Sequence, residues 1–316
     1  MSAPPEPRPI PPELAGRPLD GVVRALFGTT WGDARKWITT GKVHLDGERV
    51  TDARRKTRAG TLVTVVMTAP KPGKSARGAS LDDAAIVHMD THVVVVNKPA
   101  GVSTIPYDEG EKGTLDELVR AWLSRQTRRG DRGERPALGV VHRLDKETSG
   151  VLVFTRTWLA KQSLSSQFRA HTVHRVYLAM AHGVIESART FRSRILADRG
   201  DGLRGSLRNP RGRAEDGQLA ITHVEPIEAL DGATLVTCRL ETGRTHQIRV
   251  HLSEAGHPIV GERVYVRGYT APQIPAPRMM LHAAELGFTH PATQEQVRFE
   301  RPPPADFEET LQRLRG

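Results

Sequence analysis

The chain has 316 residues, one cysteine and a formal net charge of +10. A single cysteine, Cys238, excludes an intrachain disulfide, and no apolar run reaches the ~20 residues needed to span a bilayer. We therefore expect a cytoplasmic protein without a membrane anchor, whose excess of lysine and arginine favours phosphate-rich partners. The length predicts one large domain and a small one.

The N-terminal part is expected to contain a tail, a small module and a linker. Residues 1–17 carry six prolines, which predicts a disordered tail. Residues 18–68 predict a small unit with a helix over 19–27, a second helix over 33–40, a hairpin around the turn at Asp46 and Gly47, and a strand over 61–66. Residues 69–83 are rich in proline, glycine, serine and positive charge, which is typical of a linker.

Residues 84–316 are expected to form the larger domain. Apolar and alternating segments predict strands over 85–89, 92–97, 151–154, 173–181, 235–240 and 246–252, and helical spacing predicts helices over 114–125 and 158–168. Strands outnumber helices and no regular strand–helix alternation occurs. The fold class predicted is therefore α+β, with a bent, mainly antiparallel mixed sheet flanked by helices.

Two segments are unusually rich in arginine. Residues 124–135 contain five arginines and residues 189–213 contain eight. Both are predicted to be irregular surface loops, and beside an anionic ligand such arginines can contact phosphates.

The most informative segment, residues 142–150, reads His-Arg-Leu-Asp-Lys-Glu-Thr-Ser-Gly and precedes an apolar run. It places a carboxylate, Asp145, and an arginine, Arg143, in a polar turn that ends in glycine before a predicted strand. A strand edge holds a reactive group rigidly, and a glycine lets a ligand come close. A second polar segment, residues 243–251, reads Gly-Arg-Thr-His-Gln-Ile-Arg-Val-His. Together they indicate an enzyme that acts on a large polyanion.

Residues 142–150 resemble the signature of the RluA-type pseudouridine synthases, which isomerise uridine in ribosomal or transfer RNA. Further segments resemble that family in the same order along the chain: residues 93–102, 174–183, 242–252, 256–261, 280–284 and 290–293, the last two resembling its closing strands. The resemblance implies an RNA pseudouridine synthase that needs no cofactor and no metal, acts as a monomer and binds RNA. Large-subunit ribosomal RNA is the favoured substrate and transfer RNA the alternative.

The same resemblance assigns roles to individual residues. Asp145 matches the catalytic aspartate, Tyr177 the tyrosine that packs on the target base and helps to move its proton, and Arg249 the basic partner of the aspartate. Arg143 matches the arginine that fills the gap left by the flipped base, and Arg244 and His246 are expected to contact RNA. The sequence departs from the family at Arg175, where lysine is usual, and over residues 102–106.

The small unit resembles an RNA-binding module of a ribosomal small-subunit protein and of tyrosyl-tRNA synthetases. The resemblance covers about 50 residues and implies that Arg35, Lys36 and Lys42 contact RNA. Trp31 and Trp37 stand where that module often has smaller or aliphatic residues.

The chemistry agrees with this assignment. Isomerising uridine breaks a glycosidic bond and rejoins the base through carbon, with no redox step and no group donor. A carboxylate can attack or stabilise the electron-poor nucleoside, and a nearby guanidinium favours its ionised form. A base hidden in folded RNA must be swung out first, and something must fill the vacancy.

The sequence also allows three other interpretations. Ser149, His142 and Asp145 could suggest a hydrolase triad, but three groups within one turn cannot easily align as a relay. The histidines at 246, 251, 257, 282 and 290 could suggest a metal, yet their spacing matches no common ligand pattern. A non-catalytic RNA-binding or ribosome-assembly factor would be expected to lack the aspartate or its arginine partner, and both are present.

Overall fold

The computed structural model of the protein describes residues 7–67, 81–107, 111–126, 137–199, 203–207, 217–266 and 268–316. The chain forms two compact units, residues 1–77 and 78–316. Residues 68–80 and 127–136, which include most of the predicted linker and of the first arginine-rich segment, lie outside the described residues. None of the helices in the described ranges is long and apolar enough to cross a membrane.

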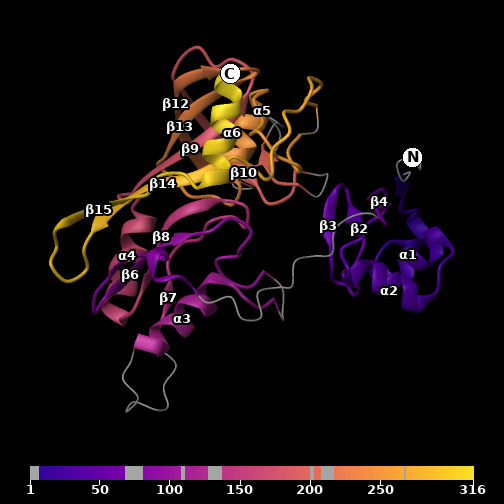
Figure 1. Cartoon of the computed structure of the whole chain (residues 1–316), viewed down its shortest axis with the longest axis horizontal. Coiled ribbons are helices and arrows are strands. Elements are labelled where there is room, and N and C mark those ends of the chain that lie inside the picture. Colours follow the sequence, from indigo (N-terminus) through magenta and orange to yellow (C-terminus); the bar gives the residue numbers. More distant parts are fainter. Residues whose placement is uncertain are drawn as a thin grey trace. The chain divides into compact units, whose positions relative to one another are not determined.

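The small unit packs two helices against a four-stranded sheet (Figure 1). Its elements are β1 (Arg8–Pro9), the 3-10 helix η1 (Pro12–Leu14), α1 (Leu19–Phe27), α2 (Trp31–Thr39), β2 (Val43–Leu45), β3 (Glu48–Val50) and β4 (Leu62–Val65). The strand order is β1-β4-β2-β3. The apolar side chains of α1 at helical spacing and the alternate residues of β2 and β4 form one buried cluster.

The proline-rich tail was predicted to be disordered, and from residue 8 that prediction is wrong. Arg8 and Pro9 pair with β4, and Ile10 is buried in the cluster of the small unit. Prolines are compatible with an edge strand, where a missing N–H costs no ladder bond. Ile10 and Leu14 pack on the cluster, and the Ile10 N–H donates to the Thr61 carbonyl at 2.9 Å, so the segment is held in place.

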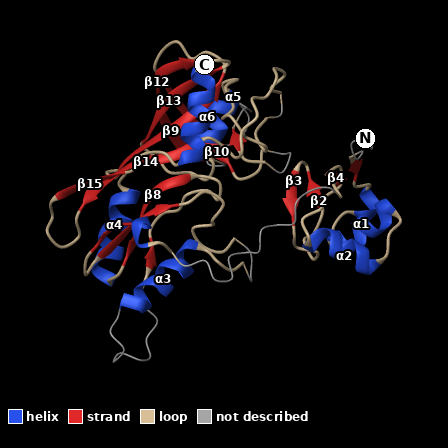
Figure 2. Cartoon of the chain, viewed as in Figure 1, coloured by secondary structure: helices blue, strands red, loops and turns tan. Residues whose placement is uncertain are grey.

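The large unit is built on one extended sheet with helices on its faces (Figure 2). Its strands are β5 (Ile86–Met89), β6 (Val93–Lys98), β7 (Gly139–Val140), β8 (Ser149–Thr155), β9 (His174–His182), β10 (Arg189–Leu196), β11 (Gly205–Ser206), β12 (Gln218–Leu230), β13 (Ala233–Leu240), β14 (Leu281–Thr289) and β15 (Gln296–Glu300). Its helices are η2 (Asp83–Ala85), α3 (Leu115–Gln126), α4 (Trp158–Arg169), α5 (Gln247–Glu254) and α6 (Ala305–Arg315).

The order across this sheet is β11-β10-β12-β13-β9-β14-β8-β6-β5, with β15 paired to β14 and β7 to β8. Among the described strands, every pairing is antiparallel except that of β14 with β8. The predicted α+β class with a mainly antiparallel mixed sheet is therefore confirmed.

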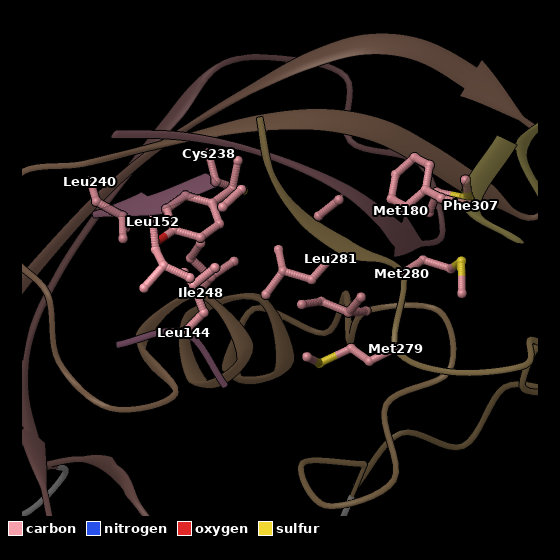
Figure 3. Close-up of a cluster of buried hydrophobic side chains, with 14 of the residues drawn as sticks. Leu144, Leu152, Met180, Cys238, Leu240, Ile248, Met279, Met280, Leu281 and Phe307 are labelled. Carbon is pink, nitrogen blue, oxygen red and sulfur yellow. The ribbon is translucent and has the colours of Figure 1, made fainter. Parts of the chain in front are cut away.

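Strand alternation explains why the sheet carries helices on both faces. Val94 and Val96 of β6 point into the main buried cluster with side chains of α3, whereas Val93 and Val95 point into a second cluster with side chains of α4. Both faces of β6 and β8 are thus covered, which accounts for their uninterrupted apolar runs. Figure 3 shows part of the main cluster, in which Leu144, next to Asp145, and Ile248, next to Arg249, are both buried.

Three segments differ from the predictions for this unit. Residues 246–252 were predicted as a strand and form most of α5 instead. Residues 290–293 were compared with a closing strand and form the turn between β14 and β15, closed by a bond from the His290 N–H to the Glu295 carbonyl. The segment 189–213 was predicted to be irregular, yet residues 189–196 form β10, in which Ser193 and Ile195 face inward between exposed arginines.

Candidate active site

The loop over residues 142–148 carries Asp145 and is fixed by bonds to a neighbouring turn. The hydroxyl of Thr104 donates to the Leu144 carbonyl at 2.9 Å and accepts from the Leu144 N–H at 3.1 Å. The Lys146 carbonyl accepts from the Gly101 N–H at 2.8 Å. The residue before Asp145 and the residue after it are therefore both held by the segment that follows β6.

Gly150 explains how the loop enters the sheet. Gly150 pairs with Ala283 of β14, and its φ of 114° is a conformation that other residues rarely adopt. A Cβ at this position would lie 2.1 Å from the Ala283 carbonyl oxygen. The glycine thus permits the close parallel approach of β8 and β14, which places the loop at the edge where β14 begins.

Asp145 in this loop and Arg249 on α5 lie 104 residues apart in sequence and are in contact. Arg249 Nη1 donates to Asp145 Oδ2 at 3.3 Å. The side chain of Asp145 is 19% exposed and that of Arg249 is 11% exposed. The carboxylate is therefore partly accessible, so a ligand can reach it while it stays in contact with the Arg249 guanidinium.

Helix α5 brings Arg249 into place because the side chain of its first residue, Gln247, ties the start of the helix to neighbouring segments. Gln247 Oε1 accepts from the Arg244 N–H at 3.0 Å and from the Thr242 hydroxyl at 2.8 Å, and Gln247 Nε2 donates to the Ile221 carbonyl at 2.9 Å. These bonds tie the start of α5 to β12, and Ile248 packs into the main cluster. Arg249 is left on the partly exposed side of the helix, opposite Asp145.

A second carboxylate, Glu262, holds the other edge of the Arg249 guanidinium. Arg249 Nε and Nη2 donate to Glu262 at 2.7 and 2.8 Å. The Glu262 side chain is 1% exposed, and it also accepts from the N–H groups of Arg263 and Val264 at 2.9 and 2.8 Å. Burial opposes ionisation, but the bonds from Arg249 and the backbone keep the pKa of Glu262 below its ordinary value.

His246 and Tyr265 complete the surroundings of this pair. His246 Nε2 lies 3.9 Å from Asp145 Oδ1, and His246 Nδ1 lies 2.7 Å from the Tyr265 hydroxyl. Arg249 lies over the Tyr265 ring, 5.1 Å from its centroid. Burial lowers the pKa of His246 to about 4, so this ring is neutral at pH 7 and adds no charge beside Asp145.

Tyr177 lies on the face of the sheet that packs against Leu144 and Ile248, the neighbours of Asp145 and Arg249. It lies on β9, opposite Ala283 of β14, and its ring joins the buried cluster that contains Leu144 and Ile248. Burial raises the pKa of Tyr177 to about 12. Its hydroxyl therefore stays protonated across the neutral range.

Five other residues were predicted to contact RNA, two in the large unit and three in the small unit. Arg143 is exposed beside Asp145, and Arg244 donates from Nε to the Leu219 carbonyl at 2.9 Å. In the small unit, Arg35 and Lys36 are exposed on α2 and Lys42 follows that helix. Arg35 Nε donates to Asp20 at 2.8 Å, so one of its edges is already used within the unit.

The geometry does not support a hydrolase triad. Ser149 Oγ lies 3.0 Å from His282 Nδ1 and accepts from Arg278, and Ser149 is buried. His142 Nε2 accepts the Val153 N–H at 3.1 Å, away from Ser149. Across the described ranges, no group of three or more His, Cys, Asp or Glu side chains is arranged to hold a metal ion.

Sequence reasoning missed Glu262 and Tyr265. Glu262 comes directly after the segment 256–261, and Tyr265 comes three residues later. In that segment Gly261 has a φ of 82° and lies close to the Arg278 backbone. An acidic residue just after such a glycine, with a tyrosine three residues later, was the available signal.

Comparison with known proteins gives one consistent family. Residues 92–254 match the RNA pseudouridylate synthase family, and residues 17–63 match the S4 domain. The chain is 36% identical to a ribosomal large subunit pseudouridine synthase D of Xanthomonas campestris, over 97% of this chain and 91% of that protein. It is 34% identical to the synthase of the same name from Pseudomonas aeruginosa, over 97% and 94%. The solved structure of human RNA pseudouridylate synthase domain containing 4 is 27% identical and covers 73% of this chain and 93% of its own, with a TM-score of 0.58.

Proposed function

Because the chain belongs to the RNA pseudouridylate synthase family, we propose that it isomerises uridine in large-subunit ribosomal RNA with Asp145 as its catalytic carboxylate. The observation that carries the proposal is the partly exposed Asp145 oxygen pair beside the Arg249 guanidinium. The ribosomal substrate is supported by relatives named for large-subunit ribosomal RNA that align with nearly the whole chain. We infer from such a substrate that the protein acts in the cytoplasm.

The reaction is balanced without an added reagent. The bond between C1′ of the ribose and N1 of the base breaks, C1′ joins C5, the C5 proton leaves, and N1 gains a proton. The Asp145 carboxylate attacks or stabilises the electron-poor flipped nucleoside, and the Arg249 guanidinium balances the negative charge of that carboxylate. Tyr177 lies against the target base and passes a proton as a neutral hydroxyl, and Arg143 fills the vacated position in the RNA.

The remaining basic groups bind the RNA around this centre. Arg244 and His246 lie at the start of α5 and are assigned to the substrate strand. Arg35, Lys36 and Lys42 belong to the S4 domain and are assigned to a second contact with the same RNA. The enzyme acts as a monomer in this proposal, which light scattering of the purified protein checks directly.

The test is to map pseudouridines in total RNA from cells with and without the gene. One or more sites in large-subunit ribosomal RNA should disappear and return with the wild-type gene, but not with Asp145→Asn. Loss of sites only in transfer RNA would overturn the proposed substrate. Restoration by Asp145→Asn would overturn the role of Asp145.

A further inference from the structure

Tyr107, in the segment between β6 and α3, carries an aromatic ring that the fold leaves in solvent. Tyr107 is 78% exposed, more than any other large hydrophobic residue in the described ranges. Single exposed apolar residues are common on protein surfaces and need no function. Two further observations distinguish Tyr107: its backbone is fixed, and it lies beside the loop that carries Asp145.

The segment that carries Tyr107 is held by hydrogen bonds on both sides. The Ser103 carbonyl accepts from the Leu115 N–H at 2.8 Å, which ties the segment to the start of α3. Glu111 Oε2 accepts from the Tyr107 N–H at 2.8 Å, and Glu111 Oε1 accepts from the Ser103 hydroxyl at 2.8 Å. An aromatic ring on a backbone that is already fixed loses less conformational entropy on binding a ligand than one on a mobile loop.

The Glu111 carboxylate also connects Tyr107 with the loop that carries Asp145. Glu111 Oε1 accepts from Lys146 Nζ at 3.2 Å, so a single carboxylate group lies between the Tyr107 N–H and the side chain of the residue after Asp145. Burial opposes the ionisation of Glu111, but the bonds from Tyr107, Ser103 and Lys146 keep its pKa below the ordinary value. The carboxylate is therefore ionised at neutral pH, and Lys146 balances its charge.

The exposed groups near the ring fit a strand of RNA. Arg143 and Lys146, on either side of Asp145, are both exposed. Aromatic rings beside cations are typical of surfaces that bind single-stranded RNA, because the cations contact phosphates and bases stack on the rings. Since every base has a π-face, such stacking requires that the nucleotide be unpaired but selects weakly among the four bases.

We propose that Tyr107 stacks on an unpaired base that flanks the target uridine and thereby selects uridines whose neighbour is free of base pairing. The inference rests on the proposed reaction at Asp145. In that reaction Arg143 occupies the position vacated by the flipped uridine, and Tyr107 holds a base next to it. The stack forms when the RNA binds and persists through the isomerisation, so it contributes to affinity and not to the chemical step. Tyr107 follows directly on residues 102–106, over which the chain departs from the family, so the contact belongs to a segment particular to this chain.

Cross-linking in cells locates this contact without any assumption about which RNA is bound. The photoreactive amino acid p-benzoylphenylalanine replaces Tyr107 or, as a control, Trp158. Trp158 is 71% exposed at the start of α4, which follows β8, whereas Asp145 precedes that strand; its seven residues span about 20 Å. Cross-linked nucleotides are mapped together with the pseudouridines that depend on the gene. Position 107 should cross-link to a nucleotide adjacent to such a pseudouridine, and position 158 should not.

A second measurement tests stacking by removing each partner in turn. Affinity is measured by filter binding of a synthetic RNA around the cross-linked nucleotide, and rate by single-turnover tritium release from the same RNA labelled at C5 of the target uridine. Tyr107→Ala should bind about tenfold to 100-fold more weakly, with a rate at saturating RNA near that of wild type. Tyr107→Phe keeps the ring and should bind as wild type does, and so should the control Trp158→Ala.

An abasic nucleotide in place of the cross-linked base completes the test. It should weaken binding to wild type by the same factor as Tyr107→Ala and should not weaken binding to Tyr107→Ala any further. Equal additional losses in both enzymes would overturn the stacking and leave the proposed activity standing. The same holds if a gene-dependent pseudouridine exists and position 107 cross-links no closer to it than position 158. Cross-links beside a gene-dependent pseudouridine in transfer RNA would instead support the contact and overturn the ribosomal substrate.

Discussion

Glu262 holds Arg249 by two hydrogen bonds of 2.7 and 2.8 Å, both shorter than the 3.3 Å contact from Arg249 to Asp145. The buried Glu262 carboxylate therefore fixes the guanidinium through Nε and Nη2. The more exposed Asp145 carboxylate contacts only the third nitrogen, Nη1. This division leaves Asp145 free to act on a ligand while the positive charge beside it stays in place. The arrangement allows the roles of the two carboxylates to be separated experimentally.

Glu262→Gln should reduce both stability and rate. It removes the charge that balances a largely buried guanidinium but retains an oxygen for the backbone donors. Breaking a buried ion pair in this way costs about 3 kcal/mol in the free energy of unfolding, measured by urea denaturation. Glu285→Gln is a matched control, because Glu285 pairs with His174 and Arg298 on a more exposed part of the sheet. Equal losses in the free energy of unfolding of the two variants would show that Glu262 does not stabilise the protein more than an exposed acid does.

Asp145→Asn should abolish pseudouridine formation and leave RNA affinity nearly unchanged. The substitution keeps the shape of the side chain and removes the anionic oxygen that the reaction needs. Product is measured by tritium release and affinity by filter binding of the same RNA. Asp231→Asn, at an exposed turn between β12 and β13, is the control and should behave as wild type. If Asp145→Asn forms product at the wild-type rate, Asp145 is not the catalytic carboxylate.

Tyr177→Phe separates the hydroxyl from the ring. If the hydroxyl moves a proton, the single-turnover rate should fall by about 100-fold while RNA affinity is retained, because the ring remains. Since burial raises the pKa of Tyr177 to about 12, the ratio of the wild-type and variant rates should be constant between pH 6 and 9. A variant as fast as wild type would limit Tyr177 to packing against the base.

Much of the fold and of the candidate site could be predicted from short-range patterns. Asp145 stood out because a polar turn precedes an apolar strand, and β6 and β8 stood out because both of their faces are buried. Helix α5 could not be recognised, because Ile248, Val250 and Leu252 alternate as in a strand. The start of this helix is held by the bond of Gln247 to Ile221 of β12, which is a tertiary contact. Periodicity is a weak guide wherever such contacts decide the structure.

The same limit applies to the site. Arg249 was assigned from a family motif, but its bidentate partner Glu262 is marked only by its place directly after Gly261, and that place does not by itself distinguish a buried acid from an exposed one. Lys98 likewise reads as part of an ordinary turn, and only the three backbone carbonyls that accept from its Nζ reveal its place. Polar groups that are satisfied by distant backbone atoms leave little trace in the sequence.

Gly150→Ala should destabilise the large unit far more than Gly256→Ala. Both glycines have positive φ, 114° and 86°, but a Cβ on Gly150 would meet the Ala283 carbonyl whereas none of the described atoms lies within 4 Å of one on Gly256. Backbone strain with steric overlap should cost about 4 kcal/mol at Gly150, against about 1 kcal/mol for strain alone at Gly256. Urea denaturation of the two variants measures the difference. Similar losses would mean that β8 and β14 can separate locally without cost.

Acid should destabilise the large unit through its buried histidines. Burial lowers the pKa of His142 to about 3 and that of His251 to about 4, against about 6.5 in the unfolded chain. Between these values the unfolded state binds more protons, so stability is fully present above pH 6.5 and decreases as the pH falls toward 4. His142→Gln keeps an acceptor for the Val153 N–H but does not titrate, so its urea midpoint should depend less steeply on pH. His171→Asn, an exposed position with a φ of 60° that asparagine tolerates, is the control and should keep the wild-type slope. A wild-type slope in His142→Gln would show that His142 does not contribute to the acid sensitivity.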